Sequence, residues 1–236
     1  MKKLSIVIPV YNENNSLADL VERVEKANTG PLEKEIILVD DKSTDGSAEV
    51  MKRLAEEKPH VKAFYHAQNT GKGGALRTGF KNVTGDIVII QDADNEYDPN
   101  EYLKLLNPIL TGKADAVFGS RFIGGEEHRV LFYWHSLGNK VLTTFSNMLA
   151  DLNLTDMEVC YKVMTREVLE KVLPKLKSNR FGFEPEITAR LARLKCRIFE
   201  VGISYNGRTY AEGKKIGWKD GVAALWHIFY FNIIDR

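Results

Sequence analysis

The sequence predicts an α/β fold in which a Rossmann-like, mainly parallel sheet carries helices on both faces. Short apolar runs rich in β-branched residues alternate with amphipathic helical patterns from the N-terminus to about Arg121. Polar clusters follow these runs, as they do at the carboxyl ends of strands in open α/β sheets. The 236 residues suffice for one large α/β domain, and no stretch rich in Pro, Gly or Ser divides them.

The first half of the chain supplies most of the expected elements. Strands are expected at Leu4–Val10, Glu35–Val39, Val61–Tyr65, Ile87–Gln91 and Ala116–Gly119. Helices are expected at Ser16–Ala27, Ser47–Glu57, Gly73–Lys81 and Pro99–Leu110. The first helix has one apolar face, and its start resembles a capping box formed by Ser16 and Asp19.

The C-terminal half alternates less regularly. Arg129–Leu149 reads as a long, largely apolar helix and Phe183–Arg193 as a second helix. Arg197–Val201 is expected to form a short strand. Ser204–Gly217 is rich in glycine and basic residues, which indicates a loop.

The last residues predict an amphipathic helix. Apolar and aromatic side chains recur at near-helical spacing in Val222–Ile234, with Lys214, Lys215 and Lys219 before or near this stretch. Aromatics with lysines suit a helix at a membrane interface, and a helix packed on the domain or on another subunit is the alternative. We therefore expect a domain over residues 1–215 and a C-terminal helix over residues 216–236. No segment has the roughly 20 apolar residues that span a bilayer.

Composition narrows the partners and the compartment. The formal net charge of +1 gives no case for nucleic-acid binding, so any basic site must be local. Cys160 and Cys196 lie far apart and outside metal-ligand spacing, which favours reduced thiols in a cytosolic protein. We expect a cytoplasmic protein, peripheral at the inner face of a membrane.

The acidic stretch after the fourth strand is the sharpest chemical signal. Asp92 and Asp94 follow the apolar run Ile87–Ile90, and alternate carboxylates at a strand end can face one side together. Mg²⁺ and Mn²⁺ prefer such oxygen ligands and complete their shells with substrate phosphates. The alternative is a solvated turn that caps the next helix, a role for which Asp98 before Pro99 is better placed.

Two further clusters suit a nucleotide. The loop Gly71–Gly74 could cradle phosphate at a helix N-terminus, but His66 and Gly73 break the Walker A pattern and Leu76 breaks the dinucleotide pattern. The alternative is a tight turn with Lys72 in solvent. Asp40 or Asp41 could accept hydrogen bonds from a nucleoside, while Asp45 caps the following helix.

Basic residues are the last group. Arginine pairs with phosphate through its planar fork. For each residue taken singly, an exposed charge is the alternative. The residues in question are Arg121, Arg129, Arg208, Lys214 and Lys215.

As a set, these motifs resemble the family 2 glycosyltransferases of the GT-A fold. The resemblance rests on Ser5–Glu13, Val39–Ser47, Gly71–Ala75 and Gln91–Asp94. Within that family the chain is similar to the dolichyl- and polyprenyl-phosphate mannose or glucose synthases, which share the stretch Gly119–Gly125. The similarity is dense over residues 4–125 and patchier to about residue 215.

The resemblance implies roles at the donor side. It assigns the metal, Mg²⁺ or Mn²⁺, to Asp92 and Asp94, with Glu96 as a third ligand. Lys72 would approach the donor, and Asp40 would lie near the pocket. The nucleotide pocket would be lined by Pro9, Tyr11, Glu13 and Asp41.

The resemblance also implies roles at the acceptor side. Arg121 and Arg129 would bind the acceptor phosphate, and Arg208 with Lys214 would close a loop over it. Asp156 matches an acid of the mannose synthases, although the residues after it differ, and the chain lacks the C-terminal transmembrane helices of several relatives. The expected catalytic residues are Asp94, Arg121 and Asp156.

The expected reaction is inverting transfer of a hexose from a GDP-mannose or UDP-glucose type donor to a polyprenyl or dolichyl phosphate. A sugar hydroxyl acceptor is the alternative, and it would need Asp156 or Glu158 as a base. Sugar-1-phosphate nucleotidyl transfer ranks low because Tyr11-Asn12-Glu13 replaces a glycine-rich loop. A nucleotide-sugar-binding subunit without catalysis is the remaining reading. The expected partners are the membrane surface and a membrane protein or a second copy of the chain.

Overall fold

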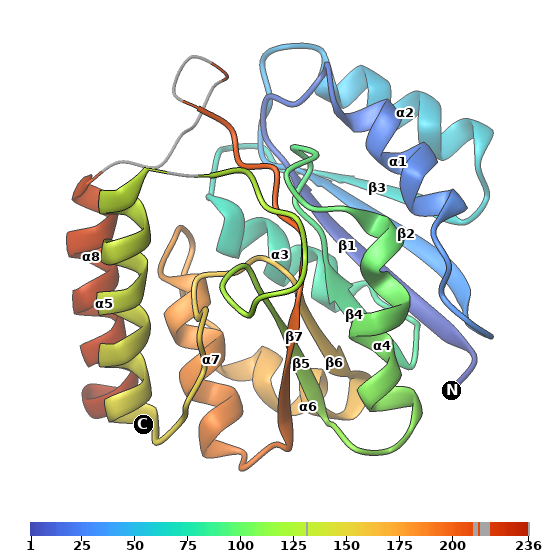
Figure 1. Ribbon diagram of the computed structural model, residues 1–236. Coiled ribbons are helices and arrows are strands. Elements are labelled where there is room, and N and C mark those ends of the chain that lie inside the picture. The colour runs from blue at the N-terminus through green and yellow to red at the C-terminus, as the bar shows by residue number, and fades with distance from the viewer. Residues whose placement is uncertain (131, 210–211, 213–217, 236) are drawn as a thin grey trace.

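The chain folds around a seven-stranded sheet (Figure 1). The structure is a computed structural model and describes residues 1–130, 132–209, 212 and 218–235. Across the sheet the strand order is β3-β2-β1-β4-β6-β5-β7. The strands are β1 (Lys3–Val10), β2 (Glu33–Asp40), β3 (Val61–Tyr65), β4 (Ile87–Ile90), β5 (Ala116–Ser120), β6 (Lys162–Thr165) and β7 (Ile198–Gly202).

The sheet is mainly parallel, as predicted, with one exception. Strand β6 lies between β4 and β5 and runs antiparallel to both. The sequence analysis missed this strand because it has four residues and its first, Lys162, is charged and fully buried. The antiparallel strand brings Lys162 into the middle of the sheet, next to the strand that leads to Asp92.

Helices cover both faces of the sheet, which confirms the predicted layers (Figure 1). One face carries α1 (Leu17–Lys26), α2 (Ser47–Glu57), the 3₁₀ turn η1 (Pro99–Glu101) and α4 (Tyr102–Leu110). The other carries α3 (Lys72–Lys81), α6 (Arg166–Val172), the 3₁₀ turn η2 (Leu173–Lys175) and α7 (Phe183–Arg193).

Two further helices lie side by side at one end of the molecule (Figure 1). They are α5 (Tyr133–Ala150) and α8 (Trp218–Phe229), and α8 continues into a π-helical turn, η4 (Tyr230–Ile234). Helix α8 contacts both α5 and α7, and it buries Ala224, Ile228 and, through η4, Phe231. The predicted C-terminal helix is therefore packed on the domain along one side. The expected boundary near residue 215 lies outside the described residues.

The starts of two helices differ from the prediction, and the cap predicted at Asp98 is confirmed. Helix α5 begins at Tyr133 rather than near Arg129. Ser16 makes no side-chain cap on α1, so the expected capping box was wrong. Its hydroxyl donates instead to the carbonyl of Ala93, at 2.8 Å, which ties α1 to the acidic turn after β4. Asp98 does cap η1, because its side chain accepts from the backbone N–H of Asn100.

The core lies on both faces of the central strands. Because helices cover both faces, the strands read as continuous apolar runs rather than alternating ones. All four residues of β4 are fully buried, as are Ile6, Val7 and Ile8 of β1. Glu35 of β2 departs from this apolar pattern, because it is a carboxylate with 3% of its surface exposed.

Hydrogen bonds make the burial of Glu35 tolerable. Its oxygens accept from the Ser5 hydroxyl at 2.7 Å, from Lys62 at 2.6 Å and from the backbone N–H of Thr84 at 2.9 Å. Burial alone would raise the pKa of Glu35, but these bonds together lower the pKa to about 2. Glu35 therefore joins β1, β2, β3 and the turn before β4 as an ionised group.

Replacing Glu35 with Gln should lower the free energy of unfolding by about 2 kcal/mol at pH 7, because hydrogen bonds to a charged acceptor are lost. A carboxylate whose pKa falls on folding stabilises above its unfolded-state pKa. The wild-type advantage should thus be complete above pH 4.5 and disappear as the pH falls toward 2. Urea unfolding across this range measures it, with exposed Glu33→Gln as control. An advantage that does not change with pH would contradict the assignment.

Candidate active site

The turns that follow three strands share an uncommon backbone conformation. Asn12 after β1, Lys42 after β2 and Asn95 after β4 have φ values of 55°, 66° and 60°. Non-glycine residues seldom adopt the left-handed region, and such residues concentrate at functional sites. All three lie at the carboxyl edge of parallel strands, where ligands bind in folds of this kind.

Asp41 anchors the glycine loop that precedes α3. Its carboxylate accepts from the backbone N–H groups of Thr70 at 2.8 Å and of Gly71 at 2.6 Å, and it contacts His66 Nδ1 at 2.8 Å. Asp40 accepts from the backbone N–H of Ser43 at 3.1 Å. Both carboxylates, predicted to lie at a nucleotide pocket, hold the backbone of loops at this edge of the sheet.

The glycine loop is pressed against a second loop, which precedes α7. The backbone N–H of Gly74 donates to the carbonyl of Asn179 at 3.0 Å. A Cβ atom at Gly71 would lie 2.5 Å from that carbonyl oxygen, and one at Gly73 would lie 2.3 Å from the oxygen of Ser178. The two glycines are therefore required by close backbone approach, and they flank Lys72, the first residue of α3.

Lys72 lies between two carboxylates. Its ammonium group is 2.8 Å from Asp92 Oδ1 and 3.1 Å from Glu184 Oε1. Burial alone would lower the pKa of Lys72, but the nearby negative charges, Asp92 foremost, raise it well above its usual value. Lys162, fully buried, binds the other oxygen of Glu184 at 2.7 Å and also donates to the carbonyls of Met157 and Val159. Asp92, Lys72, Glu184 and Lys162 form a line of alternating charge.

Arg208 occupies the other half of the acidic turn. Its guanidinium is 2.8 Å from Asp94 Oδ2 and 2.9 Å from Glu13 Oε1, and its Nε lies 3.6 Å from Glu96 Oε1. Burial, together with the charges of Asp92 and Glu96, raises the pKa of Asp94 to about 7. The sequence analysis placed Glu13 with the nucleotide and Arg208 with the acceptor, and the structure brings the two together.

Glu96 holds the backbone that carries Arg208. Its oxygens accept from the backbone N–H of Arg208 at 2.8 Å and from the Tyr205 hydroxyl at 2.7 Å. Its carbonyl also accepts from the backbone N–H of Asn206 at 3.0 Å. Both carboxylate oxygens of the expected third metal ligand therefore already have partners.

Arg121 forms a two-pronged ion pair with Asp156. Nε is 2.6 Å from Oδ2 and Nη2 is 2.7 Å from Oδ1, and Asp156 is fully buried. Asn139 of α5 contacts both partners. The guanidinium also lies over the Tyr205 ring, 5.1 Å from its centre. Tyr205 thus touches the expected acceptor arginine with its ring and the acidic turn with its hydroxyl.

The remaining expected residues are less closely gathered. Arg129 pairs with Glu212 at 2.8 Å and donates to the Gly207 carbonyl at 3.1 Å, so it holds the segment that carries Arg208. Tyr11 is partly exposed at the end of β1, and Pro9 lies within that strand. Lys214 and Lys215 lie outside the described residues.

Three contributors escaped the sequence analysis: Lys162, Glu184 and Tyr205. Lys162 stands in the short strand that was not predicted, and Glu184 stands at the start of a predicted helix, where a single charge gives no signal of its partner. Tyr205 lies in the glycine-rich stretch that was interpreted as a loop. A charged residue inside an otherwise apolar segment, such as Lys162, is the one sequence sign of a buried pair.

The donor set of the acidic turn fits a divalent cation. Asp92 and Asp94 present carboxylate oxygens, and the cationic groups of Lys72 and Arg208 stand at these oxygens. Hard cations such as Mg²⁺ bind through one or two carboxylates and complete their shells with water and phosphate. Within the described ranges, no three His, Cys, Asp or Glu side chains are arranged as a metal site. The two aspartates fit a metal that arrives with a phosphorylated ligand.

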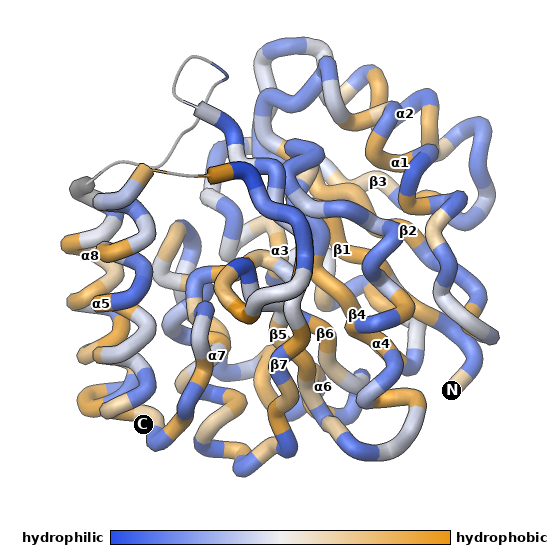
Figure 2. The backbone as a smooth tube through the Cα atoms, viewed as in Figure 1, coloured by the Kyte–Doolittle hydropathy of each residue, from blue (hydrophilic) through white to orange (hydrophobic). Residues whose placement is uncertain are grey.

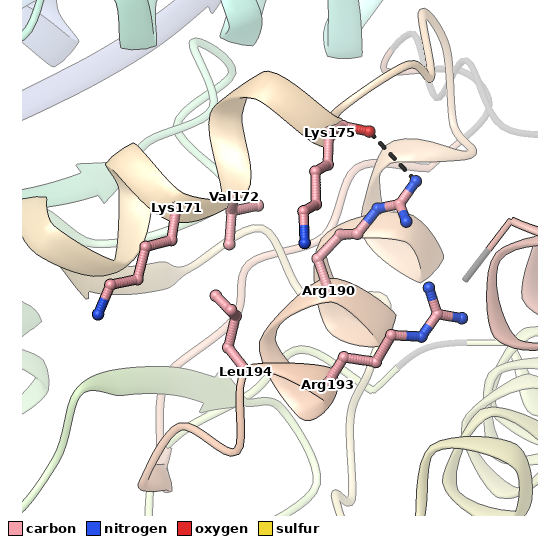
Figure 3. A pocket seen from close by; sticks show the side chains of 6 residues that line it. All are labelled: Lys171, Val172, Lys175, Arg190, Arg193 and Leu194. Atoms are coloured by element: carbon pink, nitrogen blue, oxygen red, sulfur yellow. Dashed lines mark hydrogen bonds between the residues drawn. The ribbon is translucent and has the colours of Figure 1, made fainter.

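A small basic cavity elsewhere is not part of this site (Figure 3). It has a volume of about 60 Å³ and lies between α6, η2 and α7, lined in part by Arg190 and Arg193. Arg190 pairs with Asp235 at 2.6 Å, and Arg193 donates to the Phe231 and Asp235 carbonyls. These arginines fasten the C-terminal turn to α7.

Comparison with known proteins identifies the family of the chain. Residues 5–173 match Glycosyl transferase family 2. The chain is 31% identical over 229 residues to an undecaprenyl-phosphate mannosyltransferase of Micrococcus luteus, covering 93% of this chain and 90% of that protein. It is 29% identical to a dolichol-phosphate mannosyltransferase of Pyrococcus furiosus, covering 96% of this chain and spanning 63% of that protein.

A solved structure shares the fold. Glucosyl-3-phosphoglycerate synthase from Mycobacterium tuberculosis, in complex with Mn²⁺, uridine diphosphate and phosphoglyceric acid, superposes with a TM-score of 0.73 at 18% identity. The match covers 99% of this chain and 79% of that one. The fold and the family match together define a glycosyltransferase of the GT-A fold. The chain belongs to glycosyl transferase family 2, which confirms the family suggested by its motifs.

Proposed function

We propose that the chain transfers a hexose from a nucleoside diphosphate sugar to a polyprenyl phosphate, with a divalent cation at Asp92 and Asp94. The names of the two mannosyltransferases support the acceptor class. Mn²⁺ and uridine diphosphate in the structural relative support the donor class and the metal. The observation that carries the proposal is the position of Tyr205, which joins the acidic turn to Arg121.

The reaction is an inverting displacement. An oxygen of the lipid phosphate forms a bond to the anomeric carbon while the bond from that carbon to the donor diphosphate breaks. The nucleoside diphosphate leaves with the electron pair. A bound Mg²⁺ or Mn²⁺ ion supplies charge neutralisation at the leaving diphosphate. Lys72 adds a fixed positive charge beside Asp92, and Arg121 positions the acceptor phosphate, which is ionised and needs no general base.

A sugar hydroxyl acceptor is the second candidate, and Glu158 favours it. The Oε1 atom of Glu158 is buried and has no hydrogen-bond partner among the residues that the structure describes. Burial, followed by the charge of Glu184, raises the pKa of Glu158 to about 7. A carboxylate with such a pKa suits general base catalysis near neutral pH. Asp156, the other candidate base, is fully buried and engaged by Arg121.

A donor panel tests the proposed function directly. Radiolabelled UDP- and GDP-sugars are incubated with the full chain and a short polyprenyl phosphate, with Mn²⁺, Mg²⁺ or EDTA. We expect lipid-linked product from one donor with metal and none with EDTA. Donor hydrolysis without lipid product would move the acceptor to a sugar hydroxyl. No consumption of any donor would contradict an enzymatic role and favour a binding subunit.

Arg121→Lys tests the acceptor site while a positive charge remains beside Asp156. Lysine lacks the planar fork, so phosphate binding should weaken. We expect the KM for polyprenyl phosphate to rise about tenfold, roughly 1.4 kcal/mol, with the donor KM changed less than about twofold. The control is Arg166→Lys, which alters an exposed pair with Glu170. Equal increases in both KM values for Arg121→Lys would reject the assignment.

We further propose that the α5–α8 face, the outer side of these two helices, lies on a membrane surface. Its exposed apolar side chains include Trp134, Leu137, Val141, Val222, Trp226 and Phe229. Figure 2 shows hydrophobic segments along both helices. On α5, Asn139 contacts Asp156, so the helix that carries part of this outer face also borders, on its inner side, the expected acceptor site. Among the described helices, none is both long and apolar enough to cross a bilayer.

Exposed tryptophans make the membrane proposal testable without removing α8, whose Ile228 is fully buried. Trp134 is 76% exposed and Trp226 is 56% exposed. Replacing both with Ser should reduce sedimentation with anionic phospholipid vesicles by about tenfold, because interfacial anchoring by aromatic rings is lost. The control, Tyr65→Ser, changes an exposed ring on β3. Wild-type vesicle binding by the double variant would refute the proposal, and a concentration-dependent dimer lost in that variant would assign the face to a second copy.

A further inference from the structure

Arg208 makes its ion pairs with carboxylates of the donor half of the site. Its guanidinium contacts Asp94 at 2.8 Å and Glu13 at 2.9 Å, and its side chain is 24% exposed. Asp94 belongs to the pair that fits a divalent cation, and Glu13 follows β1 beside it. In the described part of the chain, Arg208 forms no ion pair with Asp156, the partner of Arg121.

The backbone around Arg208 is fixed independently of its side chain. Glu96 accepts from the backbone N–H of Arg208, and Arg129 donates to the carbonyl of Gly207. In addition, the backbone N–H of Arg129 donates to the Tyr205 carbonyl at 2.8 Å. These contacts place the Cα of Arg208 over the acidic turn. The guanidinium can therefore leave Asp94 by rotation of its own side chain, with the backbone in place.

We infer that Arg208 is a donor-site residue that stands at the cation position until metal and diphosphate arrive, and then turns to the diphosphate. It acts as a positioning residue for the donor rather than as an acceptor-phosphate ligand. The inference builds on the proposed function in taking a nucleoside diphosphate as the ligand.

Electrostatic repulsion explains why Arg208 must leave Asp94 when a divalent cation binds there. Four carboxylates converge here, those of Glu13, Asp92, Asp94 and Glu96. In the described part of the chain, the cations that form ion pairs with them are Lys72 and Arg208. Asp94 Oδ1 already accepts from the backbone N–H of Glu96 at 3.2 Å, so a divalent cation on Asp94 would compete for Oδ2, the oxygen that Arg208 contacts. The two like charges would repel at such separations. A diphosphate brings new acceptor oxygens, which suit a guanidinium displaced by a short distance.

This role predicts opposite effects of one substitution on two ligands. If Arg208 formed only a permanent ion pair with no part in donor binding, its removal would not shift the metal and nucleotide affinities in opposite directions. If Arg208 competes with the metal, its removal must strengthen binding of the metal alone. If Arg208 then binds diphosphate, the same removal must weaken binding of the nucleotide.

The experiment compares wild type with Arg208→Gln, both as full chains checked for folding by circular dichroism. Binding of Mn²⁺ alone is followed by the electron paramagnetic resonance signal of free Mn²⁺. We expect Arg208→Gln to bind Mn²⁺ about fivefold more tightly, the change expected when a partly exposed competing pair is lost. Binding of GDP and of UDP at saturating Mn²⁺ is then measured by calorimetry, and we expect the preferred nucleotide to bind about tenfold more weakly.

Arg23→Gln is the matched control. Arg23 contacts Asn95 and Asp98 of the same turn, at 3.2 Å and 3.0 Å, without an ion pair to Asp94. This control measures the general effect of removing a nearby positive charge. The changes in Mn²⁺ and nucleotide affinity must be larger for Arg208→Gln than for Arg23→Gln. Mn²⁺ binding that is unchanged or weaker in Arg208→Gln overturns the inference, as does unchanged nucleotide binding. Because neither measurement needs sugar transfer, failure of the proposed reaction would be seen separately.

Discussion

Several carboxylates meet at one edge of the sheet, and their pairing with internal cations is the constraint on which the site depends. A buried carboxylate without a partner costs several kcal/mol, and removing one member of a buried pair leaves that cost exposed. Asp92 is balanced by Lys72, and Lys72 is shared with Glu184, which Lys162 balances from within the sheet. Glu184 and Lys162 thus hold this edge of the sheet from within the fold, and neither needs to touch a ligand.

This line of charge also accounts for features that otherwise look unrelated. Strand β6 runs antiparallel in the middle of the sheet, and this places Lys162 beneath the start of α7, where Glu184 lies. Glu186, two residues further along α7, accepts from the backbone N–H groups of Lys177 and Ser178 at 2.9 Å and 2.7 Å. That loop is the one against which Gly71 and Gly73 are pressed. The glycine loop next to Lys72 is therefore held by α7 and the loop before it, on the same face of the sheet as α3.

Much of this could be read from the sequence, and what could not has a common cause. Apolar periodicity predicted the long strands and most helices because it is a local signal, and the strand-end rule placed Asp92, Asp94 and Asp41 at one edge. Strand β6, the pairing of Lys162 with Glu184, and the contact of Arg208 with Glu13 join residues far apart in the chain. Pairing at such distances leaves no periodicity. The capping box at Ser16 failed for the same reason, since the Ala93 carbonyl took its hydroxyl.

The glycine loop next to Lys72 and the segment that carries Tyr205 and Arg208 are held in different ways, and that difference bears on the proposed order of binding. The glycine loop rests on buried ion pairs and close backbone contact. The segment that carries Tyr205 and Arg208 rests on the side chain and carbonyl of Glu96 and on Arg129. Tyr205 is the link, because its hydroxyl binds Glu96 while its ring lies under Arg121. Any movement of this segment when the proposed donor enters would reach Arg121 through that ring. Arg121, which we propose as the acceptor arginine, would then be set in place after the donor has bound.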